Sequence, residues 1–273
     1  MLYFVATPIG NLADITFRAV ATLKKCAYIL CEDTRYSKRL LHAYSIDRPL
    51  ISYHKFNEQK RIQGILDDLR EGKEIALISD AGTPGICDPG ELLTAACIAH
   101  DLPFTVVPGP NAALMALTLS GFPTGRFQFL GFLPKAQGAL SKTLEEILHF
   151  NGTTIAYETP HRLVKTLLAL EKLEAKRCIA IARELTKLHE ECLRGNVKDI
   201  LATVQATPPK GEFVLLIEGR KEGEKTWPEI LTHVEQLQRE MNLSLPLAIK
   251  CVAQLRGVPK REIYRVAHGL DQS

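Results

Sequence analysis

Apolar and polar positions along the chain form blocks that predict strands and helices in turn. Short apolar runs bounded by turn residues predict buried strands, and apolar positions three and four apart predict helices. In the first part of the chain the expected strands are Leu2–Ala6, Ala27–Cys31, Glu74–Ile78 and Phe104–Val107. The helices expected between and after them are Thr16–Lys24, Ser37–Tyr44, Glu58–Arg70, Glu91–His100 and Asn111–Leu119. Such alternation predicts an α/β fold with parallel crossovers.

A second series of elements follows the turn-rich stretch from Ser120 to Gly125. Its expected strands are Phe127–Leu133, Thr153–Tyr157, Arg177–Ala182 and Phe213–Ile217, and its expected helices are Leu140–His149 and Arg162–Leu173. The charged stretch from Arg220 to Thr226 is typical of a linker. We therefore expect an α/β domain over residues 1–120, a second α/β domain over 121–222 and a small helical domain over 223–273.

Composition narrows the class of protein. The chain has 273 residues, 46% of them hydrophobic, and a formal net charge of +3, which is typical of a globular protein and does not demand an anionic partner. Met1 leads directly into an apolar strand, and no apolar run has the length of a membrane span, so we expect a cytoplasmic protein. The seven cysteines include no C-x-x-C pair, which predicts reduced thiols and no metal site.

The positive charge is concentrated near the end of the sequence. Between Ser244 and His268 there are five basic residues and one acid, a net charge of +4 that exceeds the charge of the whole chain. Apolar positions predict a helix at Leu245, Leu247, Ala248, Val252 and Leu255, then a turn at 257–259 and a second helix from Glu262 to Gly269. Such a basic helical unit suits contacts with a phosphate backbone, and a solvated amphipathic helix explains the same pattern.

The segment from Leu77 to Gly90 is the strongest candidate for a binding loop. It joins an expected strand to an expected helix, where open α/β sheets bind ligands and glycine permits close backbone approach. Asp80, Gly82, Thr83 and Pro84 are therefore candidate site residues, although a purely structural turn has a similar composition. Similar polar clusters follow other strands, at Thr7–Asn11, Glu32–Arg35, His54–Asn57, Glu158–Arg162 and Arg183–Thr186. Together these clusters indicate one cleft.

Seven motifs, in this order, make the chain resemble the ribosomal small-subunit methyltransferase I family, within the tetrapyrrole-methylase-like superfamily. The motifs are ATPIGNLADIT, CEDTR, LISDAGTPGICDPG, VVPGPNAA, FLGFLP, YETPHRL and IARELTK. The resemblance covers nearly the whole chain. It implies two α/β lobes with a cleft between them, a small helical C-terminal domain and a homodimer.

The resemblance also implies the reaction and the site. It implies that S-adenosylmethionine donates a methyl group to the ribose 2′-hydroxyl of a cytidine in the decoding region of 16S rRNA, within the small ribosomal subunit. The residues that it places at the cofactor are Pro8, Asp80, Ala81, Gly82, Thr83, Pro84, Ile86, Asn111, Ala112, Tyr157, Ala182 and Phe213. Asn111 departs from the cysteine that many relatives carry.

Methyl transfer to a hydroxyl requires removal of a proton, so a carboxylate or imidazole is expected near the acceptor oxygen. Asp33, His54, Asp80 and Glu184 are the available groups, and we favour Asp33 or Asp80. Arg35, like Lys55, Arg162 and Arg183, is expected to hold phosphates or to orient these acids.

Each of these side chains also has a purely structural explanation. Arg35 and Asp33 can form a local salt bridge, and Glu184 can pair with a neighbour. Phe129, Phe132 and Tyr157 are expected in the core more readily than stacked on a flipped base.

Two other function classes stay open. One is a methyltransferase for a tetrapyrrole-like small molecule, which the opening sequence ATPIGNL and the basic tail disfavour. The other is an RNA-binding assembly protein without catalytic activity, which the acidic and glycine-rich motifs disfavour.

Overall fold

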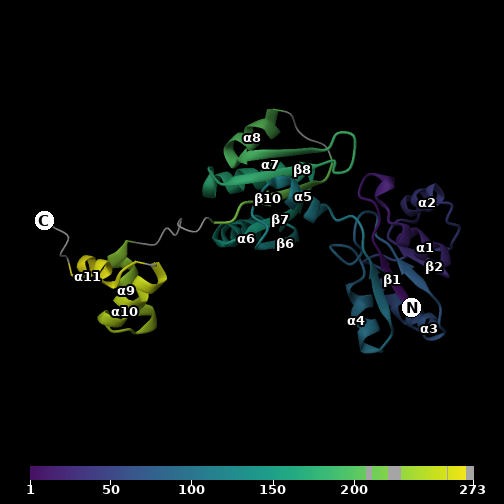
Figure 1. Cartoon of the computed structure of the whole chain (residues 1–273), viewed down its shortest axis with the longest axis horizontal. Helices are drawn as coiled ribbons and strands as arrows, with labels where there is room; N and C mark the ends of the chain where they lie inside the picture. Colours follow the sequence, from purple (N-terminus) through teal and green to yellow (C-terminus); the bar gives the residue numbers. More distant parts are fainter. Residues whose placement is uncertain (207–210, 221–228, 257, 269–273) are drawn as a thin grey trace. The chain divides into compact units, whose positions relative to one another are not determined.

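The computed structural model describes residues 1–206, 211–220, 229–256 and 258–268 (Figure 1). The chain divides into two compact units, Met1–Gly219 and Arg220–Ser273. The first unit contains two five-stranded sheets, and the second is helical in the part that is described. The α/β class and the helical end of the chain are confirmed.

The first sheet is parallel throughout. Its strands are β1 (Leu2–Val5), β2 (Tyr28–Cys31), β3 (Leu50–Ser52), β4 (Ile75–Leu77) and β5 (Phe104–Val107), in the order β3-β2-β4-β1-β5. The connecting segments hold the 3₁₀ helix η1 (Leu12–Asp14) and the helices α1 (Phe17–Lys25), α2 (Thr34–Ala43), α3 (Glu58–Arg70) and α4 (Glu91–Ala99). The parallel crossovers expected here are confirmed.

Both faces of the first sheet are covered by helices. Side chains alternate across a strand, so Phe4 of β1 packs with α3 and α4, whereas Val5 packs with α1 and α2. Strands that are buried on both faces read as continuous apolar runs, which explains why the sequence predicts them well.

The second sheet is mostly antiparallel. Its strands are β6 (Phe127–Phe132), β7 (Thr153–Glu158), β8 (Cys178–Arg183), β9 (Glu191–Asn196) and β10 (Phe213–Ile217), in the order β6-β7-β10-β8-β9. Only β6 and β7 form a parallel pair, while β10 runs antiparallel to both β7 and β8. One face packs against α6 (Gln137–His149), α7 (Pro160–Glu174) and α8 (Val197–Ala206).

The helix α5 (Ala112–Ser120) covers the other face of this second sheet. Ala116 and Leu117 of α5 belong to the same apolar cluster as Ala182 of β8 and Val214 of β10. The helix directly follows β5 of the first sheet, so it joins one sheet to the other. A boundary at residue 121 therefore separates α5 from the sheet on which it packs.

The elements that the sequence pattern does not predict are η1, β3, β9 and α8, and α9 (Ile230–Met241) falls only within the general expectation of a helical end of the chain. The strand β9 has the sequence ECLRGN, which carries charged residues and lies at the edge of its sheet, and β3 is also an edge strand of only three residues. Edge strands need only one buried face or none, so their apolar signal is weak. The helix α8 has a clear apolar side but follows β9 without an intervening loop.

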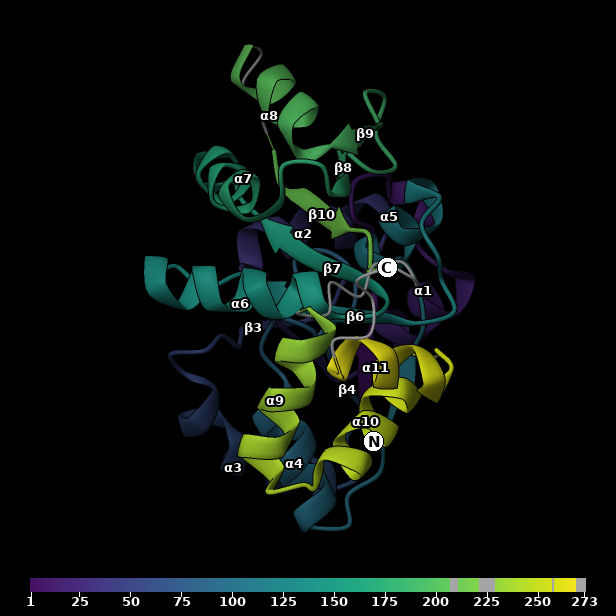
Figure 2. The same cartoon turned by 90° about the vertical axis from the view of Figure 1, so that its left-hand side faces the viewer.

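Within its described residues the second unit is a cluster of three helices, α9 (Ile230–Met241), α10 (Leu245–Arg256) and α11 (Lys260–Ala267), shown in yellow-green and yellow in Figure 2. Their shared core contains Val234, Ile249, Val252 and Ile263. Leu247 and Leu255, which were expected to pack inside, are each nearly half exposed. The expected linker after Arg220, Gly257 of the expected turn and Gly269 lie outside the described residues.

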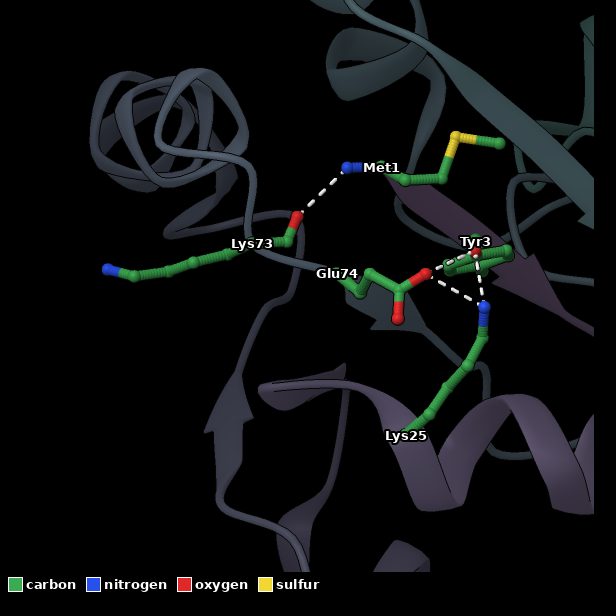
Figure 3. Close-up of polar contacts among 5 residues, drawn as sticks. All are labelled: Met1, Tyr3, Lys25, Lys73 and Glu74. Atoms are coloured by element: carbon green, nitrogen blue, oxygen red, sulfur yellow. Dashed lines mark hydrogen bonds and ion pairs between the residues drawn. The ribbon is translucent and has the colours of Figure 1, made fainter.

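The amino ends of β1 and β4 are held by a small polar cluster (Figure 3). The terminal amine of Met1 donates to the carbonyl oxygen of Lys73 at 2.9 Å, and the Lys25 ammonium bonds both Glu74 and the Tyr3 hydroxyl. This cluster lies at the end of the strands opposite to their carboxyl ends, where the candidate site lies. No helix in the described ranges is long and apolar enough to cross a membrane.

Candidate active site

A cavity of about 590 Å³ lies where polar loops leave both sheets of the first unit. The first sheet contributes residues that follow the carboxyl ends of β1, β2, β4 and β5, and these are Ile9, Glu32, Tyr36, Asp80, Ala81, Gly82, Thr83, Ile86, Cys87, Asp88, Asn111 and Ala112. The second sheet contributes Phe132, Tyr157, Ala182, Arg183, Glu184, Leu185, Lys187, Gly211, Glu212, Phe213 and Val214. Because β10 is antiparallel to β7 and β8, its first residues meet the ends of those strands. A volume of this size suits a ligand of cofactor dimensions.

The loop after β4 is held in place by backbone and hydroxyl hydrogen bonds. Thr7 and Gly82 exchange two backbone hydrogen bonds of 2.8 and 3.1 Å, and the Thr7 hydroxyl donates to the Ser79 carbonyl oxygen. Gly82 has φ +80, a backbone conformation that residues other than glycine adopt only with strain. The loop therefore presents its backbone to the cavity in a defined conformation.

Two other glycines permit close contacts at the cavity wall. A Cβ on Gly131 of β6 would lie 2.8 Å from the Cys87 sulfur, and a Cβ on Gly211 would lie 2.7 Å from a Glu184 carboxylate oxygen. The absence of a Cβ at Gly131 therefore lets β6 approach the loop that carries Cys87, whereas the flexible end of the Glu184 side chain could move away from a Cβ at Gly211.

Five carboxylates line the cavity, on Glu32, Asp80, Asp88, Glu184 and Glu212, together with the cations Arg183 and Lys187. Burial, followed by the negative charges of Glu32 and Asp80, raises the pKa of Asp88 to about 6, against the opposing effect of Lys55. The pKa of Asp80 is also raised, mainly by burial, although the Asp33 backbone N–H lies 3.4 Å from its carboxylate. The wall is therefore acidic, and Asp88 titrates close to neutral pH.

Two residues expected in the catalytic machinery, Asp33 as a candidate base and Arg35 as a residue that holds phosphates or orients the acids, do not line the cavity. Asp33 is the N-cap of α2, where its carboxylate accepts a hydrogen bond from the Arg35 backbone, and the two side chains form a 2.9 Å ion pair. Hydrogen bonds from Arg35 lower the pKa of Asp33 to about 2. A carboxylate that is so weakly basic and so engaged is a poor proton acceptor.

The other charged candidates have partners within the protein. The Arg162 guanidinium donates to the carbonyl oxygens of Leu133 and Pro134, and Arg183 pairs with Glu191 at 2.6 Å. The Lys55 ammonium donates to the carbonyl oxygen of Cys87, at the cavity wall.

Two further candidates are placed differently. Glu184 lines the cavity and pairs with Lys187 at 3.0 Å, whereas His54 accepts a hydrogen bond from the Phe56 backbone and lies outside the lining. The predicted structural pairings of Asp33 with Arg35 and of Glu184 with a neighbour both occur.

Three aromatic side chains form one side of the site. The Tyr157 ring meets Phe129 and Phe132 edge to face, with centroid separations of 5.0 and 5.6 Å. Tyr157 and Phe132 reach the cavity, and Phe132 is 46% exposed. The rings therefore offer an apolar surface to a ligand as well as to the core.

The structure brings most of the predicted residues together. Of the predicted cofactor residues, those that line the cavity are Asp80, Ala81, Gly82, Thr83, Ile86, Asn111, Ala112, Tyr157, Ala182 and Phe213. Pro8 and Pro84 do not line it. Asn111 caps α5, because its side chain accepts a hydrogen bond from the Leu114 backbone.

The main residue that sequence reasoning missed is Asp88. It lies in the C-D-P-G end of the same loop as Asp80, so its position in a glycine-rich loop between strand and helix was available as a signal. The burial of Asp88 and the acidic residues around it could not be read from the sequence.

Residues 1–201 match the family of tetrapyrrole (corrin/porphyrin) methylases. Enzymes of this family use S-adenosylmethionine as the methyl donor. The cavity fits this molecule in chemistry, because an acidic wall attracts a sulfonium cation and an aromatic surface accommodates an adenine ring. Within the described residues no group of three or more His, Cys, Asp or Glu side chains could hold a metal ion.

Comparison with known proteins extends the match to the whole chain. The chain is 45% identical to "Ribosomal RNA small subunit methyltransferase I" of Halalkalibacterium halodurans, over 98% of this chain and 94% of the relative. A relative of the same name from Thermotoga maritima is 41% identical over 220 residues, which are 81% of this chain and 99% of the relative. The crystal structure of uroporphyrin-III-C-methyltransferase from Thermus thermophilus shares the fold, with a TM-score of 0.56, 19% identity and coverage of 80% of this chain and 93% of that one.

The acid-lined cavity, the family match and the near full-length similarity agree with one another. The chain belongs to the tetrapyrrole (corrin/porphyrin) methylase family and, within it, to the group of ribosomal RNA small subunit methyltransferases I.

Proposed function

We propose that this protein transfers a methyl group from S-adenosylmethionine to the ribose 2′-hydroxyl of a cytidine in the decoding region of 16S rRNA. The observation that carries the proposal is the 45% identity to a ribosomal RNA small subunit methyltransferase I along 98% of the chain. A similarity that extends past residue 201 includes sequence beyond the methylase match itself.

The cavity residues have distinct tasks in this proposal. The bound donor supplies an electrophilic methyl group on a positively charged sulfur. The backbone of Ala81, Gly82 and Thr83 binds the polar part of the cofactor, and Tyr157 and Phe132 bind its ring. Five carboxylates in the wall favour the positively charged sulfur of the donor over the neutral sulfur of the product, which helps the product to leave.

Asp88 is the proton acceptor in the proposed reaction. It lines the cavity, and its pKa of about 6 leaves it ionised but basic enough to accept a proton at neutral pH. Asp80 shares the same wall, and its negative charge adds to the effects of burial and of Glu32 in raising the pKa of Asp88. This assignment replaces the expectation that Asp33 or Asp80 is the base.

The second unit adds affinity for RNA in this proposal. The positive charge of this unit is concentrated in residues 244–268, which carry a net charge of +4 although the whole unit carries +2, and such charge strengthens binding to phosphates without regard to sequence. The relative from Thermotoga maritima aligns over 220 residues, 99% of its own length, which is close to the length of the first unit here. The second unit is therefore an addition to the catalytic part. We further propose that the protein acts in the cytoplasm as a homodimer.

The test is transfer of labelled methyl from S-adenosylmethionine to purified small ribosomal subunits that lack their modifications, with porphyrinogens offered in parallel. Label in the RNA is expected, and none in the porphyrinogens. Label in a tetrapyrrole, with none in the RNA, would overturn the proposal in favour of a small-molecule methyltransferase.

A further inference from the structure

One surface beside the cavity is strongly basic, although the cavity itself is acidic. Residues 34–61 contain seven basic and two acidic side chains, a net charge of +5 in a chain whose total is +3. Within this segment α2 has no acidic residue. Arg35, Lys38, Arg39 and His42 are all exposed and follow the spacing i, i+3, i+4, i+7, which places them on one face of the helix.

The basic face of α2 begins at the cavity. Glu32 precedes the helix and Tyr36 lies in its first turn, and both line the cavity. Arg39 is three residues after Tyr36, so it lies one helical turn further from the cavity. In the described part of the chain, neither Lys38 nor Arg39 forms an ion pair. Their charges are therefore available to an external anion.

An exposed aromatic side chain stands in the neighbouring loop. Phe56 lies between β3 and α3 and is 94% exposed, and β3 is paired with β2, the strand that leads into α2. Lys55, next to Phe56, donates to the carbonyl oxygen of Cys87 in the cavity wall at 3.3 Å. The loop that carries Phe56 is thus tied to the edge of the cavity. A single exposed aromatic is unremarkable alone, but this one stands in a loop that follows the strand next to β2 and that Lys55 ties to the cavity wall.

These features match the way in which proteins hold an unpaired nucleic-acid strand. Such proteins combine cations that follow the phosphates with aromatic rings on which bases stack. RNA recognition of this kind uses unpaired segments, because the bases of a helix are not accessible. A solvated helix face explains exposed charge, but it explains neither the absence of acids on α2 nor the exposed ring in the loop after β3.

We infer that the exposed face of α2 and the side chain of Phe56 hold the unpaired RNA strand that leads into the cavity, a conclusion that rests on the proposed function. Lys38 and Arg39 bind phosphates of this strand, and Phe56 stacks on one of its bases. The charges are separated by location, since the acidic wall attracts the cationic cofactor and the basic face attracts the RNA.

The test is a charge-neutralising pair, Lys38→Gln/Arg39→Gln, in the full-length protein. We expect KM for unmodified small ribosomal subunits to rise about tenfold, and the slope of log affinity against log salt to fall by about 1.5. The dissociation constant for S-adenosylmethionine, measured by calorimetry, should not change. Phe56→Ala should weaken subunit binding at least about fivefold, and Phe56→Trp should restore it.

The matched control is Lys165→Gln/Lys172→Gln, which removes two exposed charges seven residues apart on α7. The charge-preserving pair Lys38→Arg/Arg39→Lys should behave as the wild type. If the wild type methylates subunits and the α2 pair behaves as the α7 pair does, the inference is overturned while the proposed function stands. If the wild type transfers no methyl to RNA, the proposed function itself fails.

Discussion

Asp88 is the residue whose environment most clearly departs from that of an ordinary surface carboxylate. Burial and the charges of Glu32 and Asp80 raise its pKa to about 6, whereas Arg35 lowers the pKa of Asp33 to about 2. The two aspartates therefore differ by several orders of magnitude in basicity. The sequence indicated the local pairing of Asp33 with Arg35, but it could not show the raised pKa of Asp88, because that arises from burial and from Glu32, which is distant along the chain.

Replacement of Asp88 by Asn removes the proposed proton acceptor with little change in volume. We expect kcat to fall about 100- to 10,000-fold while affinity for S-adenosylmethionine is retained. In the wild type kcat/KM should rise with pH, level off above about pH 6 and follow the ionisation of Asp88. Rates measured between pH 5 and 8 test this, and an unchanged pH profile in Asp88→Asn would exclude Asp88 as the base.

The same substitution should stabilise the fold at high pH. The folded pKa of Asp88 lies above its ordinary value of 3.8, so ionisation costs stability above about pH 6, and the cost disappears below about pH 4. After allowance for the solvent that still reaches this side chain, Asp88→Asn should raise the free energy of unfolding by about 1 kcal/mol at pH 8. Thermal unfolding at pH 8 and pH 4 measures the difference. A variant less stable than the wild type at pH 8 would contradict the assigned burial.

At the level of elements, the cavity depends on how loops leave the two sheets. Strands buried on both faces, such as β1 and β4, carry continuous apolar runs and were predicted within one or two residues. The loop after β4 was predicted as a site from its glycines and Asp80. Its conformation was not, because that depends on the hydrogen bonds between Thr7 and Gly82.

The second sheet shows where prediction from sequence stops. Alternation of strands and helices indicates an α/β fold but does not distinguish parallel from antiparallel pairs, and β9 is too polar to be recognised. The packing of α5 on the second sheet was also not predictable, because an apolar helix does not reveal which surface it covers. The aromatic wall was expected as core, and its exposure at Phe132 depends on the shape of the cavity.

Gly82→Ala should disturb the binding loop more than it disturbs the fold. At φ +80 a Cβ costs about 1 to 2 kcal/mol, and the strain falls on the backbone that faces the cavity. We expect a lower melting temperature and weaker S-adenosylmethionine binding, measured by calorimetry. Gly64→Ala is the control, since a Cβ there meets nothing within 4 Å. At this exposed position of α3 the substitution should raise the free energy of unfolding by about 0.5 to 1 kcal/mol. Equal cofactor affinity in both variants would contradict a role for this loop.

On the scale of the whole molecule, the proposed function assigns catalysis to the first unit and affinity for RNA to the second. The first unit contains the cavity, and the second adds a basic helical cluster. The sequence indicated both parts, because a change of composition and a cluster of positive charge are visible without a structure.

A protein that ends at Gly219 should retain catalysis. We expect an unchanged kcat and affinity for S-adenosylmethionine, and a KM for small subunits that is raised about tenfold or more at physiological salt. Steady-state kinetics at two salt concentrations measure both quantities. A truncated protein that binds the cofactor but has lost kcat would show that the second unit takes part in catalysis.

The decisive measurement is identification of the methylated atom. Small subunits that lack the modification are incubated with the wild-type protein and S-adenosylmethionine, and the RNA is digested and analysed by mass spectrometry with position mapping. A single 2′-O-methylcytidine in the decoding region, absent with Asp88→Asn, is the predicted result. Methylation of a base nitrogen or carbon, or of no nucleotide at all, would contradict the proposed reaction.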